Sequence, residues 1–214
     1  QDGTRRSCRP GETTGAGMLD CKKALEETNG DFDAAIDYLR EKGISKAAKK
    51  ADRIAAEGLA AVLIKNNDAV IVEINSETDF VAKNEEFKEL VNNVLTSIID
   101  NNVTTNEEAL KLSVNGETVE DMIIAKTSKI WEKLSLRRFV KLTKNDDQSF
   151  GSYIHMGGKI AVLILVNKAS EEVAKEVAMQ AAAMRPTCVR RSDLSEDRIN
   201  SEREILKEQA INEG

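Results

Sequence analysis

The sequence is poor in the residues on which most enzymes and disulfide-bonded proteins depend. Its 214 residues include one histidine, three cysteines, two prolines and one tryptophan. The single imidazole, His155, excludes every site that needs two histidines, and no cysteine pair has the C-x-x-C spacing of a zinc knuckle. An odd cysteine count also argues against a disulfide framework. We therefore expect a reducing compartment, the bacterial cytoplasm, with an organelle matrix as the alternative.

Charge and hydropathy exclude two further classes of protein. The chain carries 31 Lys and Arg against 37 Asp and Glu, a net charge of −6. This balance argues against a general nucleic-acid binder that is held by phosphate neutralisation. No apolar run approaches the ~20 residues that span a bilayer, and no charged-then-apolar leader opens the chain. Because 41% of the residues are hydrophobic, the chain can still bury a core.

One candidate phosphate-binding loop fails on its spacing. Six residues separate Gly151 from Gly158 where the motif needs four, and Ile160 follows Lys159 where the motif needs Ser or Thr. Strands are also expected on both sides, where a helix should follow. No serine or cysteine is marked as a nucleophile beside His155, and no carboxylate pair stands out. We predict no catalytic residue, no metal ligand and no cofactor.

The N-terminal quarter is expected to be irregular at first and then helical. Residues 1–13 lack apolar periodicity. Asp20 can cap a short helix that Asn29-Gly30 closes, and Asp31 can cap a second helix that ends at Gly43. Residues 45–57 favour a linker helix by propensity. We expect the lysines of this segment to form a solvent-exposed face of the helix, with contact to a phosphate as the alternative. These lysines are Lys46, Lys49 and Lys50.

Two later stretches each predict an antiparallel hairpin followed by a helix. The first hairpin turns at residues 66–68, and its helix is capped by Asn84 and carries a long apolar stripe. The second hairpin turns at Gly157-Gly158, and Ser170 caps the Ala-rich helix that follows it. The apolar residues of this helix are Val173, Val177, Ala178, Ala181 and Ala182. The two stretches look like an internal repeat. A further helix over residues 117–134 and a strand through residues 136–142 lie between them.

The two copies of this repeat differ by about four residues. Seventeen positions separate Asn67 from Asn84, whereas thirteen separate Gly157 from Ser170. The extra residues fall at 78–81, so we expect Phe80 and its acidic neighbour in a loop at the rim of the first copy. The alternative is that Phe80 packs back into the core, as isolated apolar loop residues usually do.

Several long motifs closely resemble elongation factor Ts. The residues that carry the resemblance are TGAGMLDCKKAL at 14–25, AAKKA at 47–51, ETDFVAKN at 77–84, LRRF at 136–139, SYIH at 152–155 and AMQAA at 178–182. The resemblance covers roughly residues 13–212. Three features depart from it: Pro10 and Gly11 replace an amphipathic first helix, Trp131 replaces a glycine, and the chain stops inside the first arm of a coiled-coil hairpin. Trp131 falls on the apolar stripe that begins at Val119, a position that allows it to pack.

The resemblance implies an α+β fold that begins with a ubiquitin-associated-like helical domain and continues as a core of two related hairpin-and-helix subdomains. The implied boundaries are an irregular segment at 1–13, the helical domain at 14–44, a linker helix at 45–58, core subdomain 1 at 59–134, an incomplete subdomain 2 at 135–190, and a projecting, truncated arm at 191–214. It also implies that the arm can self-associate.

The resemblance further implies a guanine-nucleotide exchange factor for the GTPase elongation factor Tu, without direct contact to nucleic acid or membrane. The residues that match the family's partner contacts are Met18, Leu19, Lys22, Thr78, Asp79, Phe80, Val81, His155 and Gln180. Asp79 and Phe80 look like a wedge that disturbs the Mg²⁺ site of the GTPase. The alternatives are a module that docks on elongation factor Tu or on another helix without exchange and, from a different class, an enzyme with a pocket around His155.

Overall fold

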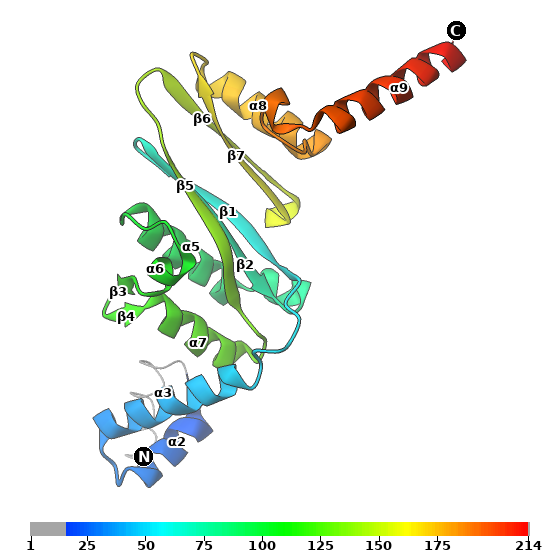
Figure 1. Ribbon diagram of the computed structural model, residues 1–214. Helices are drawn as coiled ribbons and strands as arrows, with labels where there is room; N and C mark the ends of the chain where they lie inside the picture. Colours follow the sequence, from blue (N-terminus) through cyan, green and yellow to red (C-terminus); the bar gives the residue numbers. More distant parts are fainter. Residues whose placement is uncertain (1–15, 214) are drawn as a thin grey trace. The chain divides into compact units, whose positions relative to one another are not determined.

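The computed structural model describes residues 16–213, so the irregular segment expected at 1–13 lies outside it. Within this range the protein is a mixed α+β structure with eight α-helices and small antiparallel sheets, as the sequence predicts (Figure 1). The described residues divide into two compact units, one ending at Ala182 and the other beginning at Ala183. No helix among residues 16–213 is long and apolar enough to cross a membrane.

The first unit opens with two helices, α2 (Met18–Glu27) and α3 (Phe32–Ala48). The expectation that Asp20 caps α2 is wrong: the N–H of Cys21 donates to the carbonyl of Gly17 at 3.0 Å, so the helix begins a turn earlier. Asp20 lies in the first turn, where a carboxylate is favoured by the helix dipole. Asp31 does cap α3, because its side chain accepts from the N–H of Ala34. A small core joins the two helices; its members are Cys21, Ala24, Ala35 and Leu39.

Helix α3 continues past Gly43, where we expected it to end. Glycine inside a helix costs about 1 kcal/mol relative to alanine. At this position glycine leaves room for α7, because a Cβ on Gly43 would lie 3.4 Å from Oγ of Ser128. The Ser128 hydroxyl donates to the Gly43 carbonyl at 3.1 Å. Close packing of α3 on α7 (Val119–Ile130) therefore overrides the end signal. The separate linker helix over 45–57 is also wrong, since helical structure stops at Ala48.

The first predicted hairpin is confirmed as β1 (Glu57–Lys65) and β2 (Asp68–Ser76). Asn66 takes a left-handed φ of 56° in the turn, a conformation that asparagine tolerates. The predicted strand through 136–142 is confirmed as β5 (Ser135–Thr143), which pairs antiparallel with β2. β2 is thus the central strand of a three-stranded sheet.

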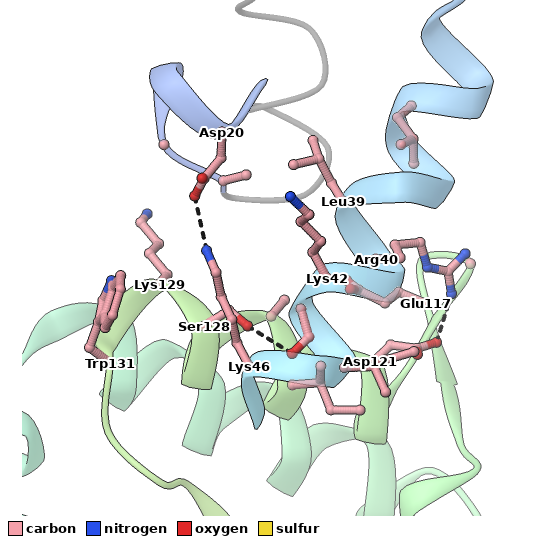
Figure 2. Close-up of a pocket in the computed structure, with 18 of the residues that line it drawn as sticks. Asp20, Leu39, Arg40, Lys42, Lys46, Glu117, Asp121, Ser128, Lys129 and Trp131 are labelled. Atoms are coloured by element: carbon pink, nitrogen blue, oxygen red, sulfur yellow. Dashed lines mark hydrogen bonds and ion pairs between the residues drawn. The ribbon is translucent and has the colours of Figure 1, made fainter. Parts of the chain in front are cut away.

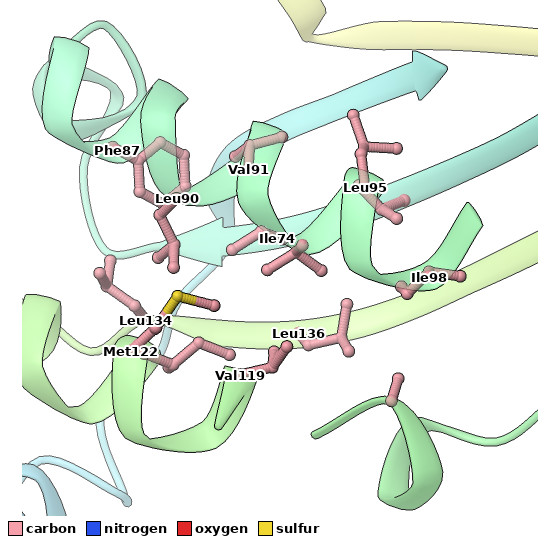
Figure 3. Packing of buried hydrophobic residues seen from close by; sticks show 14 of the residues in the cluster. Ile74, Phe87, Leu90, Val91, Leu95, Ile98, Val119, Met122, Leu134 and Leu136 are labelled. Atoms are coloured by element: carbon pink, nitrogen blue, oxygen red, sulfur yellow. The ribbon is translucent and has the colours of Figure 1, made fainter. Parts of the chain in front are cut away.

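Helix α5 (Glu85–Ile99) packs on this sheet and supplies much of the main core (Figure 3). Asn84 caps it as predicted, accepting from the N–H of Glu86 at 2.8 Å. Every residue of the predicted stripe is buried: Phe87, Leu90, Val91, Val94, Leu95, Ile98 and Ile99. They meet the inward face of β2 and residues from α7 and β5. Each large apolar side chain buried in this way contributes about 1.5–3 kcal/mol.

Between α5 and α7 the chain forms small elements for which no prediction was made. They are α6 (Asn106–Leu110), β3 (Ser113–Val114) and β4 (Glu117–Thr118). A capping box joins Thr105 to Glu108 at the start of α6, and a second joins Thr118 to Asp121 at the start of α7. Helix α7 therefore lies inside the predicted range of 117–134 but is shorter at both ends.

The second predicted hairpin is confirmed as β6 (Gln148–His155) and β7 (Ile160–Asn167), joined by a turn that includes the 3₁₀ segment η1 (Met156–Gly158). Because β6 and β7 flank the turn and no helix follows Lys159 directly, this segment does not have the structure of a phosphate-binding loop. Ser170 begins α8 (Glu171–Met184) as predicted, accepting from the N–H of Val173.

The buried stripe of α8 agrees with the prediction only in part. Ala178 and Ala182 are buried as predicted, together with Ala174, whereas Val173 and Val177 are exposed. Gly151 on β6 allows the helix backbone to come so close that only small side chains fit between them.

The second unit, described by itself, contains the 3₁₀ turn η2 (Arg191–Asp193) and helix α9 (Glu196–Glu213). The helix predicted for the tail is confirmed. Apart from the half-buried Ile199, all residues of α9 are exposed, including three large apolar ones: Ile205, Leu206 and Ile211.

Candidate partner-binding site

The segment that contains the four extra residues, 78–81, includes a one-turn helix, α4 (Asp79–Ala82), where the sequence suggested a loop. Phe80 points outward and is 79% exposed, so the alternative that it packs into the core is wrong. Val81 and Ala82 point inward and are 9% and 6% exposed. The buried Val81 anchors α4 and does not offer its side chain to a partner.

Two lysines lower the pKa of Asp79, the carboxylate next to Phe80. Nζ of Lys83 lies 3.0 Å from Oδ2 of Asp79 and 6.0 Å from the centre of the Phe80 ring. The hydrogen bond from Lys83 lowers the pKa of Asp79, and Lys159 in the β6–β7 turn lowers this pKa further. Asp79 is therefore anionic at neutral pH. The structure thus brings Lys159, far away in the sequence, into the electrostatic surroundings of Asp79.

The peptide that enters α4 is held by a carboxylate from the loop after α7. Oε2 of Glu132 accepts from the backbone N–H groups of Glu77 at 3.1 Å and Thr78 at 3.0 Å. Oε1 of Glu132 accepts from the Thr78 hydroxyl at 2.6 Å. In return, the carboxylate of Glu77 accepts from the backbone N–H of Lys133 at 2.7 Å. These four hydrogen bonds join residues 77–78 to residues 132–133, and we call them the clasp.

The clasp is tied to the segment between α3 and β1. The guanidinium of Arg53 lies 3.3 Å from the Glu77 carboxylate. Nζ of Lys133 donates to the carbonyls of Ala51 and Arg53. The N–H of Lys133 and the charge of Arg53 lower the pKa of Glu77, so this carboxylate is ionised at neutral pH. Three chain segments therefore meet at the base of α4.

The other predicted contact residues lie on different elements. Met18 and Leu19 are 62% and 83% exposed at the start of α2, with Lys22 one turn later. His155 ends β6, where the Tyr153 hydroxyl lies 3.3 Å from its Nδ1, which agrees with a hydrogen-bonded strand histidine. Gln180 is exposed on α8. Of the predicted contact residues, Thr78 takes part in the clasp, and Asp79 and Phe80 follow it directly in the chain.

The chain matches a known family over most of this region. The family model described as Elongation factor TS matches residues 77–214, which is more than half of the chain. The chain belongs to the elongation factor Ts family. This family consists of translation elongation factors that bind elongation factor Tu as exchange factors and are not enzymes. The matched range begins at Glu77 and so includes α4 and Glu132, whereas α2 and α3 lie before it.

Trp131, the residue that departs from the elongation factor Ts pattern, does not pack into the apolar stripe of α7. It is 65% exposed and takes a left-handed φ of 67° at the C-cap of α7, directly before Glu132. This conformation ends the helix and turns the indole out of the apolar stripe, while Leu134 is buried in the core beyond the helix end. Nζ of Lys46 and Nζ of Lys50 lie 5.5 Å and 5.0 Å from the indole ring centre.

Lys50 therefore does not belong to a solvated lysine face. Only 5% of it is exposed, and this burial lowers the pKa of its ammonium group. Lys46 is also engaged, because its Nζ lies 3.1 Å from Oδ2 of Asp20. The interpretation of these lysines as merely solvated is wrong for Lys50.

A cavity of about 600 Å³ lies between the α2–α3 pair and α7 (Figure 2). Ion pairs border it, with Lys46 on Asp20 and Arg40 on Asp121, each at 3.1 Å. Burial raises the pKa of Glu117 in its wall, and the nearby Asp121 raises this pKa further. The residues of α4 do not line this cavity, so within residues 16–213 it is distinct from the Phe80 surface.

Residues 16–213 contain no group of three or more His, Cys, Asp or Glu side chains that could hold a metal ion. Cys21 is buried in the small core between α2 and α3. Sequence reasoning marked Phe80 and Asp79 through the extra four residues, but it missed Glu132, because no local signal connects two residues 54 positions apart.

Proposed function

We propose that this chain is a guanine-nucleotide exchange factor that binds elongation factor Tu and promotes GDP release during translation elongation. The observation that carries the proposal is the exposed ring of Phe80, displayed on a short helix beside the anionic Asp79. Family membership supports the same partner.

The proposed mechanism needs no covalent chemistry. A protein that binds the nucleotide-free GTPase more tightly than the loaded form must, by reciprocity, weaken nucleotide binding by the same factor. An aromatic ring suits this role because it fills a pocket at modest entropic cost. Displacement of Mg²⁺ from the partner removes the largest local positive charge that holds the phosphates. Phe80 and Asp79 are the residues to which we assign this action.

The same proposal includes the finer organisation of the chain. We assign residues 14–44 to a ubiquitin-associated-like domain whose Met18, Leu19 and Lys22 contact the GTPase. We assign residues 59–134 and 135–190 to the two related subdomains, with 45–58 as the connection between the first domain and the core. Thr78, His155 and Gln180 are further proposed contacts. Val81 is not, because it is buried.

The proposal extends to the C-terminal arm and to the compartment. We assign residues 191–214 to an arm that self-associates through the exposed apolar side chains of α9, and we assign the protein to the bacterial cytoplasm or, alternatively, an organelle matrix. Sedimentation at increasing concentration tests the association, and a monomer at every concentration would reject it.

Release of fluorescent GDP from loaded elongation factor Tu tests the exchange function. We expect the chain to accelerate release and Phe80→Ala to lose most of the acceleration. Ile54→Ala is the matched control, because Ile54 is 84% exposed and lies outside the proposed contacts; it should behave as the wild type. No acceleration at micromolar chain would reject the proposal. Capture of elongation factor Tu without faster release would instead support the alternative, a module that binds without exchange.

A further inference from the structure

The clasp connects the peptide before α4 to a distant part of the chain. Glu77 and Thr78 lie between β2 and α4, whereas Glu132 and Lys133 follow α7. Each side contributes a carboxylate, and each carboxylate accepts backbone N–H groups of the other side at 2.7–3.1 Å. Backbone donors cannot rotate away from an acceptor as a side chain can. Reciprocal bonds of this kind therefore determine the path of the main chain and not only the position of a side chain.

The side chain of Thr78 bonds across the clasp and not to its own helix. It is the N-cap residue of α4, a position where a threonine hydroxyl commonly accepts from an N–H of its own helix. Here the Thr78 side chain makes no such bond. Its hydroxyl donates to Glu132 at 2.6 Å instead. Helix α4 therefore has no side-chain cap, and the Thr78 hydroxyl instead joins α4 to Glu132, which is distant in the sequence.

Helix α4 depends on such external support. It has four residues, and a single helical turn is not stable by itself in water. Two anchors hold it: Val81 and Ala82 are buried on its inner side, and the clasp restrains the peptide on its N-terminal side. The direction in which Phe80 points is set between these two anchors.

We propose that Glu132 is a positioning residue of the exchange site, which orients the Thr78–Phe80 peptide through the clasp so that the Phe80 ring is already directed outward before the partner binds. This inference rests on the proposed exchange function. Without the clasp the peptide must be ordered during binding, and the ordering reduces the interaction energy that is left for nucleotide release. Glu77 completes the clasp from the other side.

The test compares GDP release from elongation factor Tu across a concentration series of each variant. We expect Glu132→Ala to lower the maximal release rate by about 10- to 100-fold, since small displacements of a positioned group have effects of that size. The concentration that gives half the maximal rate should change by less than about threefold, because the other contacts remain. Glu132→Gln keeps an acceptor oxygen for the two N–H groups and should restore most of the rate. Glu120→Ala, which removes an exposed carboxylate from α7, is the matched control.

A double-mutant cycle separates positioning from general stability. If Glu132 acts through Phe80, then Glu132→Ala should have little effect in a Phe80→Ala background. If Glu132→Ala acted only through general stability, it would lower the GDP release rate by the same factor in the wild-type and Phe80→Ala backgrounds. That result would overturn the inference. If Glu132→Ala does not fold, Thr78→Val removes only the hydroxyl of the clasp and should show the same non-additivity with Phe80→Ala.

Amide hydrogen exchange of the free chain provides a readout that does not need the partner. The N–H groups of Glu77 and Thr78 should be protected in the wild type and lose protection in Glu132→Ala, whereas amides in the middle of α5 should not change. An unchanged release rate for Glu132→Ala beside an active wild type would reject this inference alone. An inactive wild type would reject the proposed function, and amide exchange would still show whether Glu132 holds the peptide.

Discussion

Phe80 and Phe87 are seven residues apart in the chain and have opposite environments, one 79% exposed on α4 and the other fully buried on α5. The contrast arises because α4 turns only its Val81–Ala82 side toward the core, whereas Phe87 begins the apolar stripe of α5. The two rings therefore allow stability and function to be separated with the same substitution.

Phe87→Ala should destabilise the protein by about 3–5 kcal/mol, the usual cost of removing a buried phenyl ring. Phe80→Ala should stay within about 0.5 kcal/mol of the wild type, as exposed substitutions usually do. Urea unfolding followed by far-UV circular dichroism measures both variants. A large loss of stability in Phe80→Ala would mean that its effect on GDP release is not specific.

Gly151→Ala should destabilise the packing of α8 on β6. A Cβ at this position would lie 2.1 Å from the carbonyl oxygen of Ala174, so the helix must move away. Overpacking of this kind costs about 1–3 kcal/mol. The urea midpoint measures the loss, and Gly17→Ala is the control because nothing lies within 4 Å of a Cβ there. Equal midpoints for the two variants would contradict the close approach of α8 to β6.

Trp131→Gly should be more stable than Trp131→Ala by about 1 kcal/mol. Both variants lose the indole and its contacts with Lys46 and Lys50, so the comparison isolates the backbone. A left-handed φ of 67° favours glycine over any residue with a Cβ. Thermal unfolding of the two variants in one buffer provides the measurement. If alanine proved equal to glycine, position 131 would not be left-handed in solution.

Acid should weaken the clasp through Glu77. Its pKa is lowered from the ordinary value of 4.5, chiefly by the N–H of Lys133 and then by Arg53. A lowered folded-state pKa means that the stabilisation is complete above the unfolded value of 4.5 and is lost as the pH falls through the folded value. The stability difference between wild type and Glu77→Gln should therefore be constant at neutral pH and shrink below pH 4.5. Urea midpoints across this range measure it, and a difference independent of pH would show that Glu77 does not accept these bonds as a carboxylate.

Local patterns predicted the elements whose own residues determine them. The stripe of α5 and its Asn84 cap, the hairpin turn at Asn66, and the Ser170 start of α8 all agree with the structure. Their signals depend on hydrogen bonds and side-chain periodicity within a few residues. The long motifs also led to the elongation factor Ts family, and the family match agrees.

Local patterns failed where a neighbour distant in sequence decided the outcome. Gly43 does not end α3, because α7 packs against it. Val173 and Val177 are not the buried face of α8, because Gly151 brings the helix too close for large side chains. Trp131 leaves its apolar stripe for a different, local reason, because the backbone turns left-handed at the end of α7.

The two hairpins with the helices that follow them, the family, and the extra residues around Phe80 could be read from the amino-acid sequence, because each is written in contiguous residues. Only the tertiary structure decided that Phe80 faces solvent while Val81 is buried. It also decided that Glu132 holds residues 77–78, which connect β2 to α4. Burial and reciprocal hydrogen bonding depend on which surfaces meet when β2 and α7 pack together, and no local pattern contains that information.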